Sequence, residues 1–68
     1  MAETSTPSPP TPGQLAGIAH TVDDLAVRIA EAADGAQSVG RAAMAAELWE
    51  AERALRTARR RLTRAQQG

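Results

Sequence analysis

Apolar side chains recur at alternating steps of three and four residues over the first half of the chain, and this spacing constrains the fold more than any other feature. The positions are Leu15, Ile18, Val22, Leu25, Ile29 and Ala32. A helix turns through about 100° per residue, so residues at this spacing share one face. The pattern therefore predicts an amphipathic helix over about residues 12–34 that packs its apolar stripe against another helix.

The sequence also marks both ends of this helix. Thr11, Pro12 and Gln14 have the order of a capping box, in which the threonine and glutamine side chains each accept from the other residue's backbone N–H. Gly35 is the expected end, because glycine adopts the left-handed conformation at low cost. We therefore expect a turn over residues 35–38, with Ser38 as the N-cap of the next helix.

The second half of the chain carries a heptad pattern of its own. Leucine recurs every seven residues, and alanine recurs with the same period between the leucines, at Leu48, Ala51, Leu55, Ala58, Leu62 and Ala65. This pattern predicts a helix over about residues 39–66. A connection this short favours an antiparallel neighbour. The predicted fold class is all-α, a coiled-coil-like antiparallel two-helix hairpin over residues 11–68.

A two-helix unit buries only one stripe against another, which gives it a thin core. The chain has 68 residues and no cysteine, so disulfide bonds cannot supplement that core. Two hairpins that stack their apolar faces form a four-helix bundle, so we expect a homodimer. The expected self-association seam comprises Leu15, Ile18, Val22, Leu25, Ile29, Leu48, Leu55 and Leu62.

Residues 1–10 read MAETSTPSPP, which predicts a disordered tail rich in Pro, Ser and Thr. Pro7 with Pro10, and Pro9 with Pro12, have the spacing of a PxxP ligand, although a solubilising tail has the same composition. The chain lacks an export signal and an apolar run of membrane-spanning length. We therefore expect a cytoplasmic protein with no membrane partner.

Charge is segregated along the chain, although eight arginines balance eight acidic residues. All acidic residues precede Arg53, and residues 53–68 carry arginine without any carboxylate. Two interpretations remain open. The arginines meet the acidic turn end of a second copy, formed by Glu31, Asp34 and Glu47. Alternatively, a cluster binds nucleic-acid phosphates; it comprises Arg59, Arg60, Arg61 and Arg64.

Trp49 is the only aromatic residue, and a helical projection places it away from the Leu/Ala stripe. Its neighbours on the helix include Arg53, Arg56 and Arg60. Tryptophan and arginine are enriched at binding hot spots, so these residues are candidates for docking a protein partner. The alternative is that Trp49 packs in a second interface of the bundle.

The sequence offers no set of residues suited to catalysis. His20 is the only histidine, and a four-helix di-metal site requires a Glu-x-x-His motif that Gly17 breaks. We expect no catalytic residue, cofactor or metal, and a non-enzymatic protein–protein interaction, adaptor or regulatory module. The alternative functions are a small dimeric nucleic-acid-binding regulator and an accessory subunit of a larger enzyme.

Overall fold

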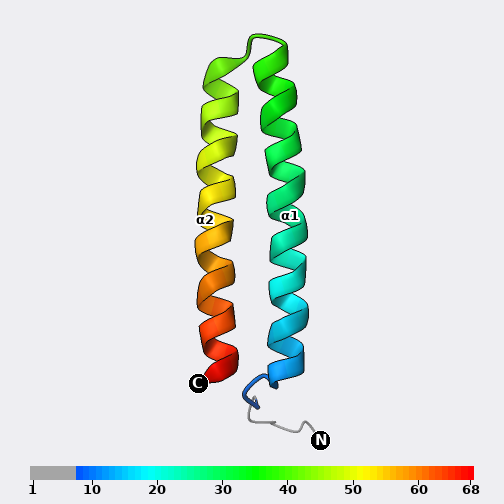
Figure 1. Cartoon of the computed structure of the whole chain (residues 1–68), viewed down its shortest axis with the longest axis vertical. Coiled ribbons are helices and arrows are strands. Elements are labelled where there is room, and N and C mark those ends of the chain that lie inside the picture. The colour runs from blue at the N-terminus through cyan, green and yellow to red at the C-terminus, as the bar shows by residue number, and fades with distance from the viewer. Residues whose placement is uncertain (1–7) are drawn as a thin grey trace, which may run out of the picture.

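The computed structural model describes residues 8–68, which fold into two helices joined by a short turn (Figure 1). Helix α1 spans Pro12–Ser38 and helix α2 spans Ala42–Gln67. They run antiparallel and pack against each other, so the start of α1 and the end of α2 lie at the same end of the molecule (Figure 1). The described residues contain no strand. The predicted all-α two-helix hairpin is thereby confirmed.

The start of α1 has the predicted capping box. The Gln14 backbone N–H donates to Thr11 Oγ1 at 3.1 Å, and the Thr11 backbone N–H donates to Gln14 Oε1 at 2.8 Å. Pro12 occupies the first turn, where its missing N–H removes no helical hydrogen bond. The sequence therefore predicted this helix start correctly.

The turn lies closer to the C-terminus than the predicted residues 35–38. Helix α1 continues through Gly35 to Ser38, and residues 39–41 connect the helices. Gly40 has a φ of 80°, and the Arg41 backbone N–H donates to the Ala36 carbonyl oxygen at 2.8 Å. Gly40, and not Gly35, supplies the left-handed residue that ends α1.

Two further expectations about the turn are corrected with it. Ser38 does not cap α2, because its Oγ donates to the Asp34 carbonyl oxygen at 2.8 Å within α1. Helix α2 begins without a side-chain cap. A glycine inside a helix costs about 1 kcal/mol relative to alanine, and the burial of Ala36 beyond Gly35 favours the longer helix despite that cost.

Among residues 8–68, only alanines are buried between the helices. The buried residues are Ala19, Ala26, Ala33, Ala36 and Ala45. Their methyl groups let two helices approach closely, but no large side chain of the described residues is fully enclosed. The molecule extends 14 Å along its shortest axis, which corresponds to a single layer of helices.

The predicted tail lies mostly outside the described residues. Residues 1–7, including Pro7, are not described, so the disorder and the PxxP spacing predicted there are untested. Residues 8–10 are exposed and belong to no helix.

Candidate interaction surfaces

The large apolar side chains lie beside the line of contact between the helices. Six residues of the predicted seam are half-buried: Leu15, Val22, Ile29, Leu48, Leu55 and Leu62. Ile18 and Leu25 are exposed, at 49% and 40% of their surface. Ile18 and Leu25 are therefore not buried against the other helix in a single hairpin, because alanines occupy the buried positions.

Helix geometry explains this displacement. Ile18 and Leu25 lie roughly 80–100° around α1 from the buried Ala26, both on the same side. Leu55 and Leu62 are rotated by a similar angle from the buried Ala45 on α2. Because the helices are antiparallel, both rotations point to the same long side of the hairpin. We call this side the open face; it comprises Ile18, Val22, Leu25, Ile29, Ala32, Met44, Leu48, Leu55 and Leu62.

A shallow groove runs along the α1 part of the open face. It is lined by Pro10, Gln14, Gly17, Ile18, Thr21 and Val22. The Thr21 hydroxyl donates to the Gly17 carbonyl oxygen at 3.2 Å, so its hydrogen bond is satisfied within the helix. A Cβ atom at Gly17 would meet nothing within 4 Å, which leaves the groove open. The terminal end of the open face is thus apolar and recessed.

The opposite long side carries ion pairs that join the two helices, and we call it the polar face. Asp23 on α1 lies 3.5 Å from Arg56 Nη1 and 3.2 Å from Arg59 Nε on α2. Within α2, Glu52 accepts from Arg56 Nε at 2.6 Å. The polar face is defined by Asp23, Glu52, Arg56 and Arg59 together with Trp49.

Arg56 is held by a carboxylate from each helix. The hydrogen bond to Glu52 raises the pKa of Arg56 above its ordinary value. Desolvation opposes this rise, and the charges of Glu52 and Asp23 add smaller contributions in the raising direction. The Glu52–Arg56 pair has the i, i+4 spacing that places two residues on one side of a helix. The sequence did not predict the part played by Asp23, because that contact depends on the register between the helices.

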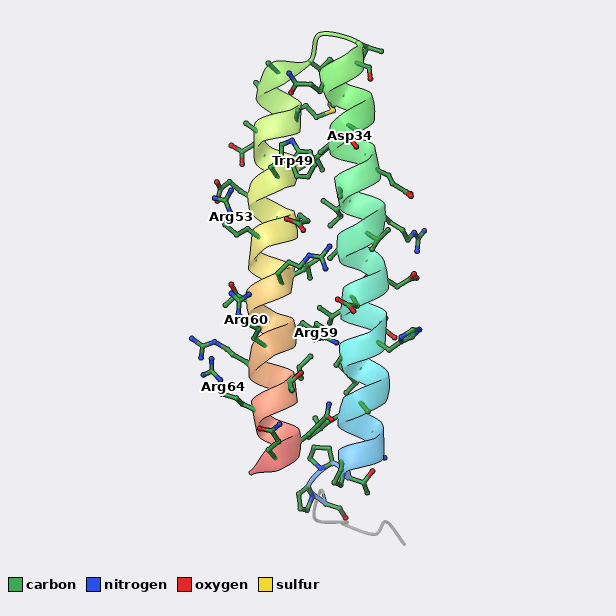
Figure 2. All side chains as sticks on the ribbon, in the orientation of Figure 1. Asp34, Trp49, Arg53, Arg59, Arg60 and Arg64 are labelled. Carbon is green, nitrogen blue, oxygen red and sulfur yellow. The ribbon has the colours of Figure 1, made fainter. Side chains whose placement is uncertain are left out.

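Trp49 is not the exposed residue that the sequence suggested. It is half-buried, and Figure 2 shows its indole ring turned toward α1. Trp49 lies away from the leucine stripe of α2, but that stripe is not the part of α2 that contacts α1. The line of contact between the helices is centred nearer Ala45. On that reference Trp49 is about 40° from the contact line. Trp49 therefore lies half-buried on the polar face.

Three arginines form a row on the outer side of α2, and we call it the arginine row. Figure 2 shows Arg53, Arg60 and Arg64 directed away from α1, while Arg59 lies between the helices. Arg53 pairs with Glu50 at 3.1 Å, and Arg60 donates to the Thr57 hydroxyl at 3.3 Å. Among residues 8–68, no carboxylate lies within 4.0 Å of the guanidinium groups of Arg60, Arg61 or Arg64.

The predicted site residues therefore divide between two surfaces. Arg56 and Trp49 belong to the polar face, whereas Arg53 and Arg60 belong to the arginine row. The predicted phosphate cluster also divides: Arg59 is paired with Asp23 on the polar face, Arg60 and Arg64 belong to the arginine row, and Arg61 is exposed elsewhere on α2. His20 is exposed and lies beside Asp23 and Asp24 in a small hollow of the polar face.

Neither helix in the described part of the chain combines the length and apolar character needed to cross a membrane. Residues 8–68 also bring together no group of three or more His, Cys, Asp or Glu residues that could hold a metal ion. Comparisons with protein-family models, curated proteins and solved structures find no match to this chain.

Proposed function

We propose that the protein is a non-enzymatic interaction module that self-associates through its open face into a four-helix bundle. The observation that carries this proposal is the contrast between a core of alanines and the exposure of Ile18 and Leu25. Burying a large aliphatic side chain contributes about 1.5–3 kcal/mol. The single hairpin forgoes much of that stabilisation, and a second layer of helices would supply it.

The small size of the fold supports the same proposal. Two helices in one layer bury too little apolar surface to offset the entropy of ordering the chain. Four-helix bundles solve this problem by packing helices on both sides of one core. The open face has the width of two helices, so a second hairpin matches it better than a single helix does.

We further propose that the assembled protein docks a partner through the arginine row. Arg53, Arg60 and Arg64 point away from α1 and do not belong to the open face, so dimerisation through that face leaves them accessible. Guanidinium groups bind carboxylates in a bidentate manner, which favours an acidic segment of another protein. Trp49 contributes to this surface by holding α2 against α1, and Arg56 by fixing the helix register.

Light scattering at two protein concentrations tests the self-association. Ile18→Gln should convert the dimer to a monomer, because it places an amide in the apolar layer. Val27→Gln is the matched control: Val27 is exposed to a similar extent, 47% against 49%, but it lies on the other side of α1. A monomeric wild-type chain, or equal effects of the two variants, would contradict the proposal.

Nucleic acid is the second candidate partner, and one observation favours it. Arg60, Arg61 and Arg64 have no carboxylate partner among the described residues, so their charge remains available to phosphates. A fluorescent oligonucleotide titrated at several salt concentrations separates the two candidates. Binding that weakens steeply with salt and is lost in an Arg60/Arg61/Arg64 triple alanine variant supports nucleic acid. No binding at low salt eliminates it.

A further inference from the structure

We propose that the copy covering the open face is inverted end to end. The two copies are related by a two-fold axis that runs between them, perpendicular to the helices, at the level of Leu25 and Leu55. This inference rests on the proposed self-association and adds the symmetry and register of the assembly. In this arrangement α1 stacks antiparallel on α1 of the second copy and α2 on α2, and the two turns lie at opposite poles.

The open face contains three layers, each made of one residue of α1 and one residue of α2 at the same height along the hairpin. Leu25 and Leu55 are equidistant in sequence from Gly40, which sets the turn, so an antiparallel hairpin holds them at the same height. The same holds for Ala32 with Leu48 near the turn, and for Ile18 with Leu62 near the termini. Successive layers are separated by one heptad, or about 10 Å along the helix.

A two-fold axis through the middle layer fits these layers to one another. The Leu25/Leu55 layer meets its own copy, and the Ile18/Leu62 layer meets the Ala32/Leu48 layer of the second copy. Each outer layer then contains one alanine from one copy opposite one isoleucine from the other. Two copies with their turns at the same pole would instead place two alanines in one outer layer and two isoleucines in the other. The inverted arrangement fills the outer layers evenly, as close packing requires.

The distribution of charge favours the same orientation. On the turn side of the middle layer, the acidic residues are Glu31, Asp34, Glu47, Glu50 and Glu52, against Arg28, Arg41 and Arg53. On the terminal side, the basic residues are Arg56, Arg59, Arg60, Arg61 and Arg64, against Asp23 and Asp24. Inversion places each basic half over an acidic half, whereas turns at the same pole would bring the arginine-rich ends together.

One pair of oppositely charged residues lies at the edge of the proposed interface. Glu47 and Arg61 are both exposed on the outer edge of α2, and they are equidistant from Ala54, next to the proposed axis. Inversion therefore brings Glu47 of each copy within about two residues, or ~3 Å along the helix, of the height of Arg61 of the other copy. With the turns at one pole, each residue would lie opposite α1 instead.

A distance between the two turns tests the orientation directly. The chain has no cysteine, so Val39→Cys carries a single nitroxide label at the exposed turn. The inverted dimer predicts a label separation of about 45 Å, because each turn lies some fifteen helical residues from the axis at ~1.5 Å per residue. Pulsed electron–electron double resonance between the two nitroxide labels should detect this distance. A separation below about 20 Å in a dimer would overturn the inversion and leave self-association intact, whereas a monomer would overturn both.

Charge reversal tests the register independently. Arg61→Glu should weaken dimerisation about threefold to tenfold, because it places Glu47 opposite a second carboxylate. The Glu47→Arg/Arg61→Glu double variant should restore most of the wild-type affinity. Arg60→Glu is the control, since it makes the same charge change on the outer side of α2. Equal weakening by Arg60→Glu, or no recovery in the double variant, would contradict the proposed pairing.

Discussion

The two long sides of the hairpin are built from the same pair of helices but reach different states in a single copy. On the polar face, Asp23 joins Arg56 and Arg59 across the helices, and Trp49 is half-buried. On the open face, Ile18 and Leu25 remain exposed. The ion pairs of the polar face therefore form within one chain, whereas apolar side chains of the open face remain exposed to solvent.

This difference separates two roles that a single seam usually combines. Surface ion pairs contribute little stability, about 0–1 kcal/mol each, but they fix the relative register of two helices. Apolar burial contributes more and is less specific. The ion pairs of the polar face determine which residues of α1 and α2 lie at the same height. Burial of the open face on assembly would add stability.

The largest effect should come from a charge in the middle of the open face. Leu55→Glu should lower the free energy of unfolding by about 3 kcal/mol or more, because the assembled layer has no partner for a carboxylate. Thermal melts followed by circular dichroism, with light scattering, measure both consequences. Thr57→Glu introduces the same side chain at an exposed position outside the open face and should leave stability nearly unchanged. An unaltered melt and mass for Leu55→Glu would remove the distinction between the two faces.

The next effect concerns the alanines on which both faces depend. Ala26 is 1% exposed, so Ala26→Leu should force the helices apart and cost about 1–3 kcal/mol. The melting temperature should fall, although leucine is the more apolar residue. Ala16→Leu, at an exposed position of the same helix, provides the comparison. A rise in stability for Ala26→Leu would show that the alanine contact is not close.

The two glycines near the turn should respond in opposite directions. Gly40→Ala should destabilise the hairpin by about 1–2 kcal/mol, because alanine is strained at a φ of 80°. Gly35→Ala should stabilise it by about 1 kcal/mol, since a Cβ there meets nothing within 4 Å and the residue is helical. Urea unfolding of both variants gives the two signs. The reverse pair of signs would return the turn to Gly35.

The smallest effect belongs to the polar face. Asp23 is 37% exposed as a side chain, so Asp23→Asn should cost at most about 1 kcal/mol, and added salt should abolish the difference from wild type. Asp24→Asn, which removes a charge outside these pairs, is the control. A loss that persists at high salt would mean that the polar face contributes more than register.

The sequence predicted both helices, because apolar spacing and the Thr11 capping box are local signals that tertiary contacts did not override. It placed the turn incorrectly because two glycines each provide a plausible helix end. Moving the turn from residues 35–38 to Gly40 slides α2 along α1 by about one heptad, and the apolar pattern looks the same in both registers. The charges distinguish them: the earlier turn sets Asp23 level with Glu50, whereas the observed turn sets it between Arg56 and Arg59.

The surfaces were less predictable than the helices. A heptad pattern predicts that its largest apolar side chains face the partner helix, which points to the leucine and isoleucine positions and not to Ala19, Ala26 and Ala33. The alanines have the same period, so periodicity alone could not rank the two sets. Close approach of the backbones decided the ranking in favour of the smaller residue. The inward turn of Trp49 follows from the same rotation.

A core of methyl groups also bears on how long the hairpin lasts once formed. Alanine has no rotamers to lose, and contacts centred on one turn are short in sequence, so the closing step should be fast. The same methyl groups offer few dispersion contacts to hold the closed form, so reopening should be fast as well. In the proposed dimer, the lifetime of the folded chain would then be set by how slowly the second copy departs.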